Sequence, residues 1–339
     1  MPRRALGVLI AAITVAAPAE GGHELPIYPS FYPHEIRIQT VDPGPAAQLL
    51  AAGEIHAYIG AEPRFGGAPA GTLSAVESLG SFVLVTVDPP DCGALQAALR
   101  TLAVGADGIV FHPYPVTPFH ADYLQHADRA DAAKQRVQEA APARGPATVD
   151  RVDATALVAA ATTSINGWVG PPWLKAGWFQ AYRLLADALE PADRQRADDA
   201  LHQLQEEDDD GLEERLNLER GLLAALTGNC RRGVAGYTVK REWFNAEFSA
   251  GIENIAADSE TGLDAPVFIR TVKLKDFPWN GWLRLGVSTG PDAAWNPVAG
   301  FSDPAGRLIW SALGDPAAFP LPGDDGWVLN RIADVKPVR

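Results

Sequence analysis

The stretch 35-EIRIQTVDPGPAAQLLAAGEIHAYI-59 decides the class of fold that we expect. Residues 35–41 alternate between polar and apolar side chains and predict a strand. Asp42-Pro43 is a typical helix start and Gly53 a typical helix stop, so the alanine-rich segment between them predicts a helix. Residues 55–59 predict a second strand. This strand–helix–strand order is typical of an α/β layer packed on one sheet.

The same order returns after this stretch. Apolar runs predict further strands and alanine-rich runs predict further helices, in the order strand 81–87, helix 91–104, strand 108–111 and helix 117–140. The Pro- and Gly-containing segment that follows the last helix predicts a linker at 142–149. We therefore expect an α/β domain over residues 20–141.

The rest of the chain predicts two more domains, because about 320 mature residues exceed what one core usually organises. Helical periodicity predicts a helical bundle at 150–228, and extended segments between turns predict a β-sheet or sandwich at 229–339. The strands expected in this last domain are 267–274, 282–287, 307–313 and 327–332. The expected fold class is thus a mixed α+β multidomain protein with an N-terminal α/β layer, a central bundle and a C-terminal β region.

Residues 1–19 predict a signal peptide. Arg3 and Arg4 precede an apolar run, and Ala17-Pro18-Ala19 places small residues at the cleavage positions. The apolar run of about a dozen residues is shorter than the roughly twenty that a transmembrane helix needs. We therefore expect an exported, periplasmic protein that is cleaved near Ala19 and has no membrane span.

The charge balance excludes one class of partner. The chain has 28 basic and 42 acidic residues and a net charge of −14, and loss of Arg3 and Arg4 with the signal peptide would make it more negative still. Such a surface repels phosphates, so a general nucleic-acid binder is excluded. The partners that we expect are a small solute or a periplasmic protein.

Cys92 and Cys230 are the two cysteines of the chain. An even number of cysteines in an oxidising compartment predicts a disulfide bond between them. Closing so long a loop would stabilise the fold by at most ~5 kcal/mol in the chain-entropy model. A bridge would also disfavour covalent catalysis by either thiol.

Histidines gather in the first part of the chain, and the densest segment is 111-FHPYPVTPFHADYLQHADRAD-131. It follows a predicted strand, and ligands of open α/β sheets bind beyond the carboxyl ends of strands. Asp122 and His126 are four residues apart on the predicted helix, a spacing at which both can hold one ion. A divalent transition metal would need a third ligand, such as His112 or His34. Alternatively, Asp122 and His126 form only a surface pair.

A second candidate site is aromatic. Three prolines hold the segment 21-GGHELPIYPSFYPHEIRI-38 extended, so its rings are presented from a stiff backbone. The residues that we expect to line a ligand pocket are Tyr28, Tyr32, His34, His112, Tyr114 and His120. The alternative is that these rings pack against the long helix and fasten the amino terminus.

The sequence contains no nucleophile elbow, phosphate-binding loop or dinucleotide fingerprint. We therefore expect a non-catalytic binding or accessory protein that holds a small polar solute, a metal ion or a partner segment at its α/β domain. One alternative is a metal-dependent enzyme that uses the His/Asp site, with Glu35 as general base. Another is an interaction module that uses the Trp-rich β region around Trp282.

Overall fold

The computed structural model describes residues 33–103, 108–141, 147–165, 170–206, 211–276, 281–292, 301, 303–314, 316–323 and 326–329. The predicted signal peptide, Tyr28 and Tyr32 lie outside the described residues, as does most of the predicted linker. The described part is a mixed α/β structure, as the sequence predicted.

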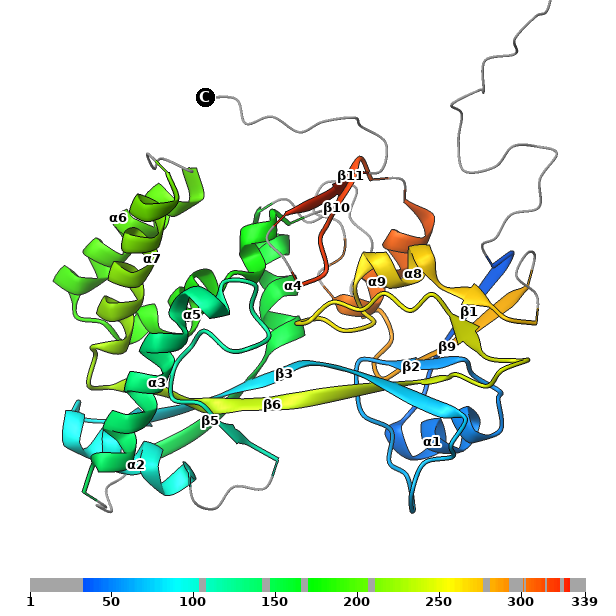
Figure 1. Ribbon diagram of the computed structural model, residues 1–339, viewed down its shortest axis with the longest axis horizontal. Helices are drawn as coiled ribbons and strands as arrows, with labels where there is room; N and C mark the ends of the chain where they lie inside the picture. Colours follow the sequence, from blue (N-terminus) through cyan, green and yellow to red (C-terminus); the bar gives the residue numbers. More distant parts are fainter. Residues whose placement is uncertain are drawn as a thin grey trace, which may run out of the picture.

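A seven-stranded mixed sheet runs along the long axis of the molecule (Figure 1). Its strands are β1 (Glu35–Thr40), β2 (Ala57–Ile59), β3 (Leu73–Val87), β4 (Val110–Phe111), β5 (Ala147–Asp153), β6 (Arg232–Asn245) and β9 (Trp282–Val287). The strand order is β1-β9-β2-β6-β3-β5, and β4 also pairs with β6. β1, β9 and β2 are parallel to one another, whereas the other pairs are antiparallel.

The two longest strands, β3 and β6, join the two ends of the molecule (Figure 1). They are 15 and 14 residues long and pair from Leu73 opposite Asn245 to Thr86 opposite Arg232. The sequence predicted only residues 81–87 of β3, because the first half of the strand is rich in Ser, Gly and Glu. Strand β5 was missed as well, since it is a largely exposed edge strand without an apolar face.

Helices cover both faces of the sheet at the end formed by β3, β5 and the first part of β6. Val83 and Val85 pack against α2 (Cys92–Ala103) on one face. Phe82 and Leu84, which alternate with them along β3, point to the opposite face and pack in one core with Trp178 of α5 (Gly177–Leu185). Successive side chains of the strand point to opposite faces of the sheet, so β3 contributes to two separate hydrophobic cores.

At the other end of the sheet, Leu50 of α1 (Pro43–Ala51) lies in one core, and Phe268 of α8 (Pro266–Thr271) and Leu308 of α9 (Pro304–Leu313) lie in another. Figure 1 shows α1 below the sheet and α8 and α9 above it.

The sequence predicted strands at 267–274 and 307–313, and most of both segments is helical, so these predictions were wrong. Short apolar runs do not distinguish strands from helices. Asp303 is a typical N-cap residue and marks the start of α9, where its carboxylate accepts the Gly306 N–H at 2.6 Å.

The predicted helices between the linker and residue 228 are present. The described elements of this layer are α4 (Ala154–Ile165), a 3₁₀ turn (Pro172–Lys175), α5, a second 3₁₀ turn (Ala186–Ala188), α6 (Pro191–Glu206) and α7 (Leu212–Thr227). They follow α3 (Tyr123–Glu139), the long helix predicted at 117–140. The strand predicted at 282–287 is confirmed as β9, but it lies in the main sheet between β1 and β2 rather than in a separate C-terminal sheet.

Smaller features complete the described part. Two short antiparallel pairs join β7 (Ile252–Glu253) to β8 (Lys273–Leu274) and β10 (Ala318–Pro320) to β11 (Trp327–Leu329). The predicted disulfide between Cys92 and Cys230 is confirmed, and it ties the start of α2 to the segment that enters β6. None of the described helices is long and apolar enough to cross a membrane.

Candidate functional site

The histidine-rich segment begins where the chain leaves β4. It turns before α3 starts, and the turn is closed by the His120 N–H, which donates to the Thr117 carbonyl at 3.0 Å. The next turn closes when the Tyr123 N–H donates to the His120 carbonyl at 3.2 Å. His120 therefore lies in the loop before α3, whereas the sequence predicted it in the first turn of the helix.

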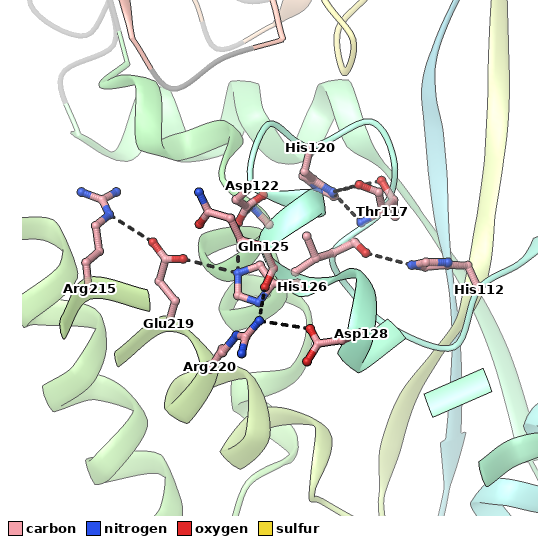
Figure 2. Close-up of polar contacts among 12 residues, drawn as sticks. His112, Thr117, His120, Asp122, Gln125, His126, Asp128, Arg215, Glu219 and Arg220 are labelled. Atoms are coloured by element: carbon pink, nitrogen blue, oxygen red, sulfur yellow. Dashed lines mark hydrogen bonds and ion pairs between the residues drawn. The ribbon is translucent and has the colours of Figure 1, made fainter. Parts of the chain in front are cut away.

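Helices α3 and α7 bring Asp122, His126 and Glu219 together (Figure 2). Asp122 is the N-cap residue of α3, His126 lies one turn later, and Glu219 comes from α7. The His126 Nε2 is 3.3 Å from Oε2 of Glu219 and 3.9 Å from Oδ2 of Asp122. One ligand atom from each residue lies within 4.8 Å of the other two. We call these three residues the carboxylate–histidine cluster.

Each carboxylate of the cluster also has an outer partner. Both oxygens of Asp122 accept from the N–H of Gly177 at 3.1 Å, at the start of α5. Glycine is required there, since a Cβ at Gly177 would come within 2.6 Å of a methyl group of Val116. Oε1 of Glu219 accepts from Nε of Arg215 at 3.1 Å, which leaves Oε2 facing the imidazole. Three helices therefore meet at the cluster.

The cluster lies in the protein interior. The side chain of His126 is fully buried, and its Nδ1 has no hydrogen-bond partner in the described part of the chain. Glu219 is 4% exposed. Two carboxylates close together in a region of low dielectric repel each other unless a cation lies between or beside them. Arg215 balances Glu219, while the side-chain partners that the described residues give Asp122 are the Gly177 amide and the imidazole of His126.

Glu219 was missed by the sequence analysis, although a local signal was present. In 211-GLEERLNLERGLLAAL-226, Leu222, Leu223 and Leu226 are buried and lie three to seven residues beyond Glu219 on the same helix face. An acidic residue on the apolar face of a helix needs a partner across the interface. The sequence cannot show that this partner is His126, which is 93 residues away.

The structure places His112 away from the cluster and gives it a protein partner. Its Nε2 lies 2.8 Å from the carbonyl oxygen of Val116, and its ring packs beside the rings of Tyr123 and Tyr237. Burial lowers the pKa of His112 below its usual value. Tyr114 is also buried, and burial raises its pKa to about 12. The aromatic residues of this loop are thus largely occupied by packing.

His120 belongs to a buried hydrogen-bond chain that leads away from the cluster. Its Nδ1 accepts from the N–H of Thr117 at 2.8 Å, so its Nε2 carries the proton and donates to Oε1 of Gln180 at 3.2 Å. The amide nitrogen of Gln180 donates in turn to Glu260. Burial lowers the pKa of His120, and burial together with the nearby Asp258 raises that of Glu260 well above its usual value.

Three other residues of interest lie at the far end of the sheet from the cluster. His34 is exposed at the start of β1, where its N–H donates to the Gly281 carbonyl at 2.8 Å. Glu35, the predicted general base, pairs with Arg37 on β1 at 2.5 Å. Trp282 is half exposed, and the guanidinium carbon of Arg37 lies 4.1 Å from its ring centroid. Neither His34 nor Glu35 is therefore part of the carboxylate–histidine cluster.

No family model, no curated protein and no solved structure matches this chain.

Proposed function

We propose that this protein is an exported, non-catalytic metal-binding protein that holds a divalent transition-metal ion at Asp122, His126 and Glu219. One observation carries the proposal. An imidazole nitrogen and a carboxylate from α3 meet a carboxylate from α7 in the protein interior. One nitrogen and two carboxylate oxygens form a donor set that suits Zn²⁺ and related ions. The Cys92–Cys230 disulfide is compatible with an oxidising compartment, which supports export.

The distances support a tetrahedral ion. Bonds of about 2.0–2.2 Å place the ligand atoms of Zn²⁺ roughly 3.3–3.6 Å apart. The separation of 3.3 Å between His126 and Glu219 lies in this range, whereas the 3.9 Å between His126 and Asp122 and the separation of the two carboxylates, which is within 4.8 Å, would shorten on binding. Arg215 and the Gly177 amide would orient the two carboxylates from outside, as outer partners do in known metal sites.

Enclosure of the cluster supports binding rather than catalysis. A tetrahedral ion held by three protein ligands has a fourth position, which in catalytic zinc sites is open to water or substrate. Here the side chains of His126, Glu219 and Asp122 are 0%, 5% and 12% exposed, and three helices surround them. An ion at this point would fasten α3 to α7, so the proposed role of the metal is to stabilise the helical layer.

The test is metal analysis of the purified protein combined with thermal unfolding. We expect one equivalent of metal per chain, and a Tm that falls on chelation and recovers with added Zn²⁺. In His126→Ala, Zn²⁺ should no longer raise the Tm above that of the metal-free variant. Comparing each variant with its own metal-free form separates lost binding from lost packing.

The chain offers a matched control in His202, which lies 3.9 Å from Glu206 four residues later on α6. Both side chains of this pair are exposed, and no third ligand accompanies it among the described residues. His202→Ala should bind one equivalent of metal and show the full Zn²⁺-dependent shift. Absence of metal from the unaltered protein, together with no Tm shift for any divalent ion, would exclude the proposal.

A further inference from the structure

A cavity of about 130 Å³ lies between α4, α9, the 3₁₀ turn Pro172–Lys175, the segment that precedes α8 and the region of β10. It is distinct from the carboxylate–histidine cluster, none of whose residues line it. Its walls are mostly apolar and include Leu174, Pro266, Trp310 and Phe319. A dry cavity of about 150 Å³ lined by apolar side chains binds benzene, so this one has room for a ring or a short hydrocarbon chain.

Three charged groups at this cavity already have protein partners. Lys175 and Asp258 form an ion pair of 2.6 Å, and Lys175 also donates to the Leu321 carbonyl at 2.5 Å. Arg307 donates to the Ala159 carbonyl at 3.3 Å. These residues therefore build the walls of the cavity and are held in place by other contacts.

Asp264 differs from these groups. It lines the same cavity, yet its carboxylate makes no hydrogen bond or ion pair with the residues that the structure describes. Burial raises the pKa of Asp264 to about 7; Lys240 opposes the rise, while Glu242 and Asp153 add to it. Asp264 is partly buried, and a carboxylate with reduced hydration and no donor is costly, so a ligand that supplies a donor would recover this cost.

We propose that this cavity binds a small organic cation, namely a protonated amine with an apolar body. The ammonium group would donate to the Asp264 carboxylate, while the hydrocarbon or aromatic part would pack against Trp310, Phe319 and the neighbouring prolines. Lys240 does not donate to the Asp264 carboxylate. Its Nζ pairs with Glu242 at 3.3 Å and donates to Thr155 and Thr261.

The first test uses the unaltered full-length protein and three probes of similar size. Benzylamine is a cation, benzyl alcohol is its neutral counterpart, and phenylacetate is an anion. Calorimetric titration at pH 8 in the presence of a chelator should show that benzylamine binds about tenfold more tightly than benzyl alcohol, as expected for a hydrogen bond to a charged group. Phenylacetate binding as tightly as benzylamine, or no binding of benzylamine, would overturn the proposal. The chelator keeps this result independent of the proposed metal site.

The second test assigns the preference to Asp264. Asp264→Asn keeps the shape of the side chain and should bind benzylamine and benzyl alcohol with similar affinity. Asp150→Asn, which removes one exposed acid from β5, should retain the tenfold preference. A preference that survives in Asp264→Asn would show that another group recognises the cation. The ranking of the three probes on the unaltered protein decides the proposal even if Asp264→Asn does not fold.

The pH dependence adds a readout that packing alone would not give. Benzylamine remains protonated from pH 8 to pH 6, while Asp264 gains a proton as the pH falls through about 7. Affinity should therefore decrease by about tenfold over this interval, and Asp264→Asn should abolish the decrease. The other ionisable groups at this site are Lys240, Glu242, Asp153, Lys175, Asp258 and Arg307, and the variant separates their contribution.

Discussion

Two histidine–carboxylate pairs on the helical layer have the same spacing and closest distance but opposite surroundings. His126 and Asp122 are four residues apart on α3 with a closest distance of 3.9 Å, and His202 and Glu206 are four residues apart on α6 with the same 3.9 Å. The side chain of His126 is fully buried, whereas that of His202 is 75% exposed. Among the residues that the structure describes, only the first pair faces a third ligand, Glu219, across a helix interface.

The difference shows that spacing along a helix does not make a site. An exposed pair in water contributes a few tenths of a kcal/mol to helix stability and is screened by salt. A buried pair with a second carboxylate nearby has lost its water and must find partners in the protein or in an ion. The chemistry proposed for Asp122 and His126 therefore depends on α7 and on the approach of α5 at Gly177.

The largest contrast should appear in stability. His126→Ala removes the group that lies between two buried carboxylates, so we expect it to lower the free energy of unfolding by about 3 kcal/mol. His202→Ala should change it by no more than about 0.5 kcal/mol, because the side chain is exposed. Urea unfolding of both variants at pH 7 measures these values. Equal effects would show that burial does not distinguish the two pairs.

Acid should destabilise the protein through a third histidine, His56, which burial and the nearby Arg284 hold at a pKa of about 4. Between pH 4 and 6.5 the unfolded state binds more protons at this residue, so its contribution is fully present above pH 6.5 and is lost as the pH falls toward 4. Allowing for solvent screening, we expect a loss of about 2 to 3 kcal/mol from His56. Urea unfolding measured between pH 4 and 7 should show a smaller slope of stability against pH in His56→Gln than in the unaltered protein.

A third contrast concerns metal affinity and the two glutamates. Glu219→Gln keeps the size of the side chain but replaces a carboxylate ligand, so Zn²⁺ affinity should fall by about a hundredfold. Glu206→Gln makes the same change beside His202 and should leave the affinity unaltered. Competition titrations with a zinc indicator give both values. An affinity that depends on Glu206 would move the site to α6.

The smallest effect is expected at an outer partner. Arg215→Met removes the donor that orients Glu219, and Zn²⁺ affinity should decrease by about tenfold. Arg196→Met removes an exposed arginine that pairs with Asp193 on α6, and it should have no effect on Zn²⁺ affinity. The same indicator competition compares them. If Arg215→Met instead strengthened Zn²⁺ binding, charge repulsion by the guanidinium would outweigh its orienting role.

Local elements of the fold were predictable wherever a segment has a clear repeat of apolar residues and typical boundary residues at its ends. The strand, helix and strand in 35–59 appear as β1, α1 and β2, and α6 and α7 lie in the segment 150–228 that was predicted to be helical. The predictions failed for short apolar runs, since α8 and α9 were taken for strands. A run of six to eight apolar residues suits either structure, and the neighbouring elements decide between them.

The sequence by itself determined the local elements that carry clear periodicity and boundary residues, the acidic charge, the cysteine pair and the one-turn spacing of Asp122 and His126, because each depends on composition or on neighbours along the chain. Only the tertiary structure decided which strands share a sheet, which histidines are buried, and that Glu219 and Asp264 face a cluster and a cavity. Those properties depend on residues that are far apart in the chain and meet only when helices and strands pack. The periodicity of a single segment carries no information about its partner.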